Sequence, residues 1–222
     1  MKRVKKKTAI AGLLEIMARL RGPGGCPWDR AQNHKTLRFH AVEEVYELMD
    51  AIDAADDHEM AEELGDLLLQ VVFHCQLANE RGAFDFEQVA RRIGDKLLRR
   101  HPHVFGEVKV RNVAEVWANW EKIKAAEKRG TRHERPSALD GIPRRLPALM
   151  RAEKLMKKAR KARLIGPAKK SRLTKDALAQ QLLDLASAAQ ASGWSAEDLL
   201  RARLQKEERA LRKKEKSDLT QR

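Results

Sequence analysis

Cysteine, aromatic residues and long apolar runs are all scarce in this sequence of 222 residues. Cys26 and Cys75 lie far apart without the spacing of a metal site, and aromatic residues make up 5% of the chain. This excludes a disulfide framework, and two free thiols indicate a cytoplasmic protein. No apolar run is long enough to span a bilayer, so we expect no membrane partner.

Basic residues are nearly absent from one part of the chain and dominate another. Residues 41–90 hold fourteen acids and one base, whereas residues 144–175 hold thirteen bases and one acid, within a net charge of +14. An acidic centre in a basic protein suits a cation site that attracts a polyanion. The same basic surplus is equally typical of nucleic-acid binding, so composition leaves both classes open.

Four acids in the acidic region have the spacing of a converging cluster. Glu44 and Glu47 are three residues apart, as are Glu63 and Asp66, so each pair shares a helix face. The polar break at residues 53–58 is short enough to predict an antiparallel helix hairpin. Counted from residue 55, the inner acids are both eight residues away and the outer acids both eleven. Glu47 should therefore lie level with Glu63, and Glu44 level with Asp66, with about 4.5 Å along the hairpin between these two levels.

Apolar stripes beside these acids predict that the carboxylates meet where the two helices adjoin. The stripes comprise Val42, Val45, Leu48, Met49 and Ile52 on the first helix, and Met60, Leu64, Leu67, Leu68, Val71 and Val72 on the second. Acidic helix faces are often simply solvated, and that interpretation stays open. The alternative is a site for a hard, oxygen-binding cation such as Mg2+.

A loop rich in glycine and proline, residues 21–29, precedes the hairpin and contains Trp28. Asp29 and Gln32 have the spacing of a helix N-cap and its reciprocal partner, and a helix is expected from about Ala31. Trp28 either staples that helix to the core or offers an aromatic face to a substrate base.

Two later helices carry further candidate substrate residues. Lys96 and Arg99 close one helix, where they either complement its dipole or reach toward phosphates. Trp120 and Lys124 share a face on the next helix, which suits either a core tryptophan or a stacking ring beside a phosphate-binding ammonium.

The C-terminal part contains a partial echo of the acidic region. The segment 181–185 resembles 63–67, but Gln181 stands where Glu63 does, and no counterpart of Glu43 to Glu47 accompanies it. If this is a second copy, its cation site has been lost.

Six segments occur in one order over about residues 9–160: Gly25 to Asp29, Glu43 to Glu47, Glu63 to Leu68, His101 to Phe105, Trp120 to Lys124 and Ser137 to Pro143. Together they resemble the MazG family of nucleoside triphosphate pyrophosphohydrolases. The resemblance implies an all-α, dimer-forming fold that uses Mg2+, with Mn2+ as an alternative. It also implies cleavage of a nucleoside triphosphate between the α and β phosphates.

The resemblance assigns roles residue by residue. The metal ligands would be Glu44, Glu47, Glu63 and Asp66, with Glu43 or Glu47 as the catalytic carboxylate that orients a metal-activated water toward the α phosphorus. Lys96, Arg99, Trp120 and Lys124 match basic and aromatic family positions that hold phosphates and base.

We therefore expect an all-α, MazG-like helical bundle on an antiparallel hairpin, with a basic helical C-terminal appendage. The expected divisions are a catalytic domain at 1–130, a linker and connecting helix at 131–165, and a degenerate second half at 166–222. The expected function is nucleoside triphosphate pyrophosphohydrolysis by a cytoplasmic homodimer. The alternative is a non-catalytic, basic nucleic-acid-binding or regulatory protein that retains the fold.

Overall fold

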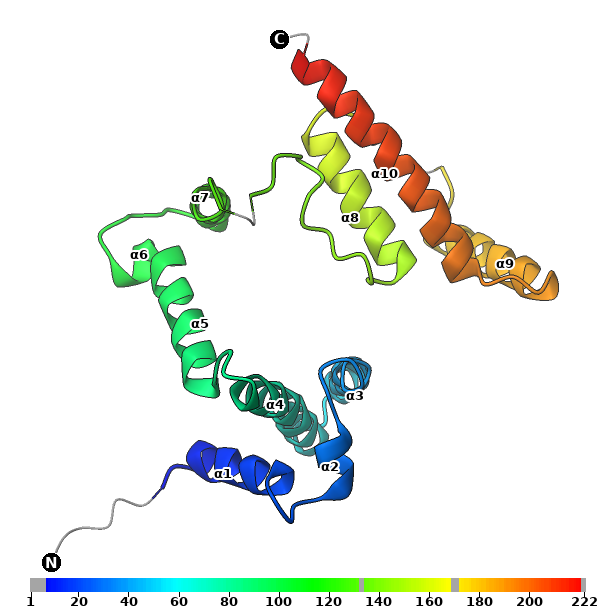
Figure 1. Cartoon of the computed structure of the whole chain (residues 1–222). Coiled ribbons are helices and arrows are strands. Elements are labelled where there is room, and N and C mark those ends of the chain that lie inside the picture. The colour runs from blue at the N-terminus through cyan, green and yellow to red at the C-terminus, as the bar shows by residue number, and fades with distance from the viewer. Residues whose placement is uncertain (1–6, 132–133, 169–171, 221–222) are drawn as a thin grey trace, which may run out of the picture. The chain divides into compact units, whose positions relative to one another are not determined.

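The protein is all-α throughout the part that the structure describes. The computed structural model describes residues 7–131, 134–168 and 172–220, and its regular elements there are helices, as the sequence predicted (Figure 1). The helices are α1 (Ala9–Arg21), α2 (Pro27–Ala31), α3 (His40–Ala54), α4 (Asp57–Glu80), α5 (Phe86–Arg100), α6 (Pro102–Phe105), α7 (Val113–Ala126), α8 (Ala148–Lys161), α9 (Lys175–Ala191) and α10 (Ala196–Thr220). Within those described ranges, no helix is long and apolar enough to cross a membrane.

The chain divides into two compact units, Met1–Trp120 and Glu121–Arg222. Helix α7 begins in the first unit and ends in the second. The three-part division at residues 130 and 165 stays a prediction.

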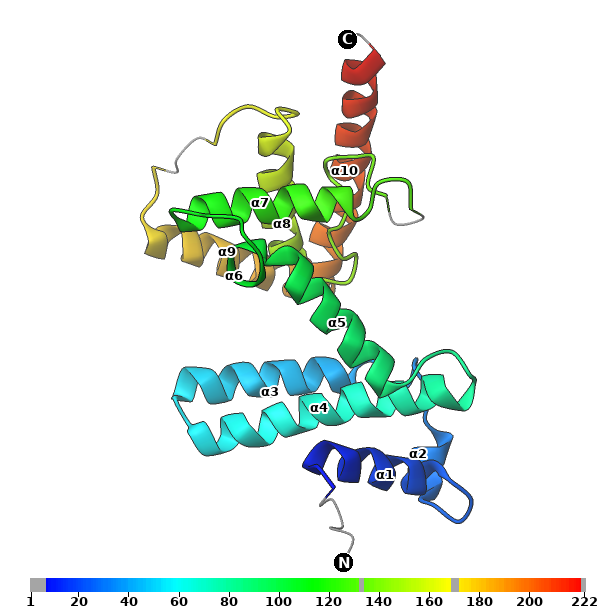
Figure 2. The same ribbon diagram turned by 90° about the vertical axis from the view of Figure 1, so that its left-hand side faces the viewer.

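The centre of the first unit is the hairpin of α3 and α4, which lie side by side (Figure 2). Ala55 ends α3 in the left-handed conformation, with φ 53°. Asp56 then caps α4 by accepting bonds from the backbone N–H groups of His58 and Glu59 at 2.9 and 3.2 Å. The predicted short break is confirmed, and an aspartate caps the helix that follows it.

The approach to this hairpin differs from the prediction. Helix α2 starts at Pro27, Asp29 lies inside its first turn, and the next helix begins only at His40. The Asp29 cap and the helix from Ala31 were therefore wrong. The physical reason is Pro27, whose fixed φ and missing N–H favour the first position of a helix.

The core of the first unit lies where α1 crosses α4. Its buried members are Met17, Leu37, Val72, Phe73 and Leu77. A two-pronged ion pair ties the same helices at their ends, since Arg21 Nε and Nη2 each donate to a Glu80 carboxylate oxygen at 2.7 Å. The hairpin is thus anchored through one end of α4.

Most residues of the apolar stripes on α3 and α4 are exposed. Ala51 is the buried residue of α3, while Met49 is 51% exposed and Leu64 is 50% exposed. We call the exposed set the α3–α4 face; it comprises Val42, Val45, Tyr46, Met49, Ile52, Leu64, Leu68 and Val71.

The second unit is built on α8, α9 and α10, with α10 packed against both of the others. Its buried core comprises Leu139, Ala148, Leu155, Ala159, Leu164, Leu204 and Leu211. At the start of α8, the carboxylate of Glu197 accepts a bond from the backbone N–H of Ala148 at 2.8 Å. Arg201 donates to the backbone carbonyls of Arg144 and Leu146 at 2.7 and 3.1 Å, which fixes the loop before α8.

Candidate metal centre

Three of the predicted ligands converge across the hairpin. Glu44 comes from α3, and Glu63 and Asp66 come from α4; one carboxylate oxygen of each lies within 4.8 Å of the others. The three-residue spacing on α4 puts its two acids on one face, and the short turn brings Glu44 to the same place. All three side chains are half-buried, so a bound cation would retain access to solvent.

A buried glutamine supports this cluster, and sequence reasoning missed it. Gln70 Nε2 donates to Glu44 Oε1 at 3.2 Å, and Gln70 is 8% exposed. It lies seven residues after Glu63, which is two turns further along the same face of α4. That spacing was the available signal.

Burial and mutual repulsion perturb two of the three carboxyls. Burial raises the pKa of Glu44 above its usual range, and the charges of Asp66 and Glu47 raise it further, although the bond from Gln70 opposes the shift. Desolvation raises the pKa of Glu63, as do the charges of Glu47, Asp66 and Glu44. A cation among these oxygens would relieve the repulsion, and the donor set of carboxylates alone fits a hard ion such as Mg2+.

The two remaining acids of the first segment have different surroundings. The charge of Glu47 contributes to the raised pKa of both Glu44 and Glu63, which places it beside the cluster. The Glu43 side chain is 66% exposed, and its carboxylate lies 3.1 Å from His40 Nδ1. His40 in turn meets Trp28 edge-on at 6.2 Å between ring centroids. Glu43 and Trp28 therefore belong to an exposed group around His40.

The predicted substrate residues do not all lie together. Lys96 and Trp120 line one cavity of about 440 Å³ in the first unit, together with Arg100 and Trp117. The Arg100 guanidinium lies 5.4 Å from the centre of the Trp120 ring, a cation–π distance. Arg99 is exposed and outside the lining.

Lys124 is in the second unit, and its ammonium pairs with Glu121 at 2.7 Å. This bond also lowers the pKa of Glu121.

Comparison with known proteins gives this geometry a family. A profile described as the MazG nucleotide pyrophosphohydrolase domain matches residues 32–105, which include the three converging acids. A Streptomyces cacaoi protein, described as an uncharacterized 26.1 kDa protein in the blaB 3' region, is 42% identical over 195 residues. The match covers 87% of this chain and 77% of that protein. The chain belongs to the MazG family.

Two further relatives have names that state an activity. The nucleoside triphosphate pyrophosphohydrolase of Escherichia coli (strain K12) is 51% identical over 150 residues, covering 67% of this chain and 56% of that protein. The Thermotoga maritima nucleoside triphosphate pyrophosphohydrolase/pyrophosphatase MazG is 47% identical over 147 residues, covering 66% and 55%. The chain thus spans about half the length of these two relatives. The resemblance to the MazG family is confirmed.

Proposed function

We propose that this chain hydrolyses nucleoside triphosphates to nucleoside monophosphate and pyrophosphate at a divalent-metal site formed by Glu44, Glu63 and Asp66. The observation that carries the proposal is the convergence of these carboxylates within 4.8 Å, inside the segment that matches the MazG domain. The names of the Escherichia coli and Thermotoga maritima relatives support the reaction type.

The ion we propose is Mg2+, with Mn2+ as an alternative, because the converging donors are all carboxylate oxygens. When bound, such an ion would neutralise phosphate charge and make a nearby water more acidic. In the proposed reaction a water oxygen would bond to the α phosphorus while the bond from that phosphorus to the bridging oxygen breaks, so that pyrophosphate leaves.

The protein's own residues would hold the substrate and move the proton. Glu47 is the better candidate to accept the proton of the attacking water, because it adjoins the cluster. Glu43 is less suited, since its carboxylate is engaged with His40 at 3.1 Å. Lys96 and Trp120 share a cavity, so we assign them to phosphate and base. Arg99, Lys124 and Trp28 stay predictions as substrate residues.

We further propose that the protein is a homodimer formed through the α3–α4 face. Soluble monomers rarely leave large contiguous apolar patches on their surface, and this set lies on two adjacent helices. The resemblance to a dimer-forming family points to a second copy as the occupant. Both thiols are free, which supports the proposed cytoplasmic location.

The test is a pyrophosphate-release assay across a panel of nucleoside triphosphates, with Mg2+, with Mn2+ and with chelator. We expect metal-dependent release that Glu44→Gln and Asp66→Asn abolish. Glu62→Gln is the matched control, because Glu62 is exposed on α4 next to the cluster and its variant should keep full turnover.

The result also decides between the two functions. Full turnover in both cluster variants would show that the site is misassigned. The non-catalytic alternative would be favoured by salt-sensitive RNA or DNA binding without pyrophosphate release, if that binding survives replacement of the four predicted ligands, Glu44, Glu47, Glu63 and Asp66.

A further inference from the structure

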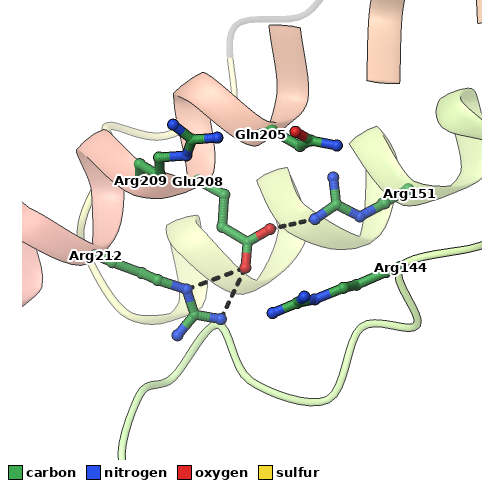
Figure 3. Close-up of a pocket in the computed structure, with 6 residues that line it drawn as sticks. All are labelled: Arg144, Arg151, Gln205, Glu208, Arg209 and Arg212. Atoms are coloured by element: carbon green, nitrogen blue, oxygen red, sulfur yellow. Dashed lines mark hydrogen bonds and ion pairs between the residues drawn. The ribbon is translucent and has the colours of Figure 1, made fainter. Parts of the chain in front are cut away.

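The second unit contains a cavity of about 340 Å³ whose wall is mostly arginine. Arg144 extends from the loop before α8, Arg151 lies on α8, and α10 supplies Gln205, Glu208, Arg209 and Arg212 (Figure 3). Four arginines and one carboxylate therefore line the cavity, and Figure 3 shows Arg151 and Arg212 reaching that carboxylate. The volume lies within the range of roughly 300–1,000 Å³ that is typical of small-molecule sites.

The single carboxylate is already fully engaged. Glu208 Oε1 accepts bonds from Arg212 Nε at 3.0 Å and Nη2 at 2.7 Å, while its Oε2 accepts a bond from Arg151 Nη2. Arg212 has a second anionic partner in Asp140, at 2.7 Å. Glu208 therefore has little capacity left for Arg144 or Arg209.

Arg151 lines this cavity, and two of its donors are buried and unsatisfied. It is 4% exposed, and its Nε and Nη1 have no hydrogen-bond partner within residues 7–131, 134–168 and 172–220. A buried charged donor without a partner is unfavourable, by more than a neutral one. Negative charge close to this guanidinium would therefore offset its cost.

A purely structural role accounts for only part of this arrangement. The bonds from Arg151 and Arg212 to Glu208 join α8 to α10 and would do so without a ligand. That role does not require Arg144 and Arg209 to line the same cavity. Arg144 is moreover held in place, because Arg201 fixes its backbone carbonyl at 2.7 Å.

We propose that this cavity binds a small anion with at least two phosphate groups, such as inorganic pyrophosphate or the diphosphate of a nucleotide. Arginine is suited to this ligand because its planar fork bonds phosphate oxygens in pairs. One phosphate would meet Arg144 and a second would meet Arg209, which are both exposed, and the phosphate charge would offset the buried charge of Arg151. This site lies in a different unit from the acidic cluster, and its existence does not depend on the proposed hydrolysis.

The test is isothermal titration calorimetry of the full chain with inorganic pyrophosphate and, separately, with a nucleoside diphosphate. Chelator is present, so that the acidic cluster without its cation repels both ligands. We expect saturable binding that Arg209→Gln and Arg144→Gln each weaken by about tenfold, the loss typical of one charged hydrogen bond.

Arg203→Gln is the matched control. Arg203 is an exposed arginine on α10 that pairs with Glu207 at 3.3 Å and lies outside the cavity lining. Its variant should bind as the unaltered chain does. Arg151→Gln should lose binding more completely, but the two exposed arginines decide the matter even if that variant does not fold.

Each outcome has a defined meaning. Binding of either ligand with the expected order of variants supports the site, and the tighter ligand identifies the source of the diphosphate. Absence of binding by both ligands would overturn the proposal, as would equal weakening in Arg203→Gln. An RNA fragment that binds through these arginines while pyrophosphate does not would also overturn it, in favour of a nucleic-acid surface.

Discussion

Replacing Glu44 by glutamine should stabilise the protein in chelator and destabilise it, relative to the unaltered chain, in excess Mg2+. The variant removes one negative charge from three carboxylates that lie within 4.8 Å of one another. It keeps a side-chain carbonyl that can still accept the bond from Gln70. The metal-free protein therefore loses repulsion without losing its supporting hydrogen bond.

The size of the effect follows from the separation of the charges. Two unit charges about 4–5 Å apart repel by about 1 kcal/mol in a water-like medium. Because Glu44 has two such neighbours at a half-buried site, about 1 kcal/mol is a lower limit for the repulsion that the variant removes. For a chain of this size, about 1 kcal/mol corresponds to roughly 2–4 °C in Tm.

Metal reverses the order of stability. A ligand at 100 times its Kd stabilises the folded state by about 2.7 kcal/mol. The variant should lose most of that gain, because it lacks one ligand and metal affinity depends on ionised donors.

Differential scanning calorimetry measures the Tm difference between the variant and the unaltered chain, which should be positive in chelator and negative in excess Mg2+. Glu62→Gln, with the same change in charge outside the cluster, should respond to Mg2+ as the unaltered chain does. If Glu44→Gln is less stable in chelator, or gains as much as the unaltered chain from Mg2+, the three carboxylates do not form a cation site.

Two other variants test the ion pair between α1 and α4 and the proposed dimer face. Glu80→Gln should cost about 1 kcal/mol at pH 7, since it weakens a charged pair that is partly exposed. The bond from Arg21 holds the pKa of Glu80 below its ordinary value of 4.5, so this stabilisation is present above that pH and is lost as pH falls. Urea unfolding at pH 7 and pH 3 checks it, and a difference that stays as large at pH 3 contradicts the assignment. Met49→Glu on the α3–α4 face should yield monomers in analytical ultracentrifugation, whereas Leu149→Glu, similarly exposed at 53% on α8, should not; a dimer that persists in Met49→Glu rules out this face.

Much of the first unit's architecture could be predicted from local signals. The turn at Ala55 and the cap at Asp56 follow from a short polar break between two periodic segments. The start of α2 could have been predicted too. Proline strongly favours the first position of a helix, so Pro27 was a better start signal than the proposed cap at Asp29. What periodicity could not show was which apolar residues are buried within one chain. The two stripes that contain Met49 and Leu64 have the spacing of a core, yet half of each of these side chains is exposed.

The candidate site was predictable to the extent that it depends on helix spacing. Residues three apart, reflected across a tight turn, were sufficient to bring Glu44 to Glu63 and Asp66. The resemblance named Glu43 and Glu47 together as candidates for the catalytic carboxylate, although one faces His40 and the other adjoins the cluster. Separating them requires the rotation of α3 about its axis, which depends on packing.

Arg151 shows the same limit for charge. In the sequence it is one of thirteen bases between residues 144 and 175, and a basic stretch of that kind is usually a solvated surface. The fold buries this one at 4% exposure, while it leaves Arg144 and Arg209 exposed on the same cavity. A buried arginine beside a fully engaged carboxylate needs an acceptor, whereas an exposed one has water. Counting charges identifies a basic protein, but burial indicates where on that protein an anion would be bound.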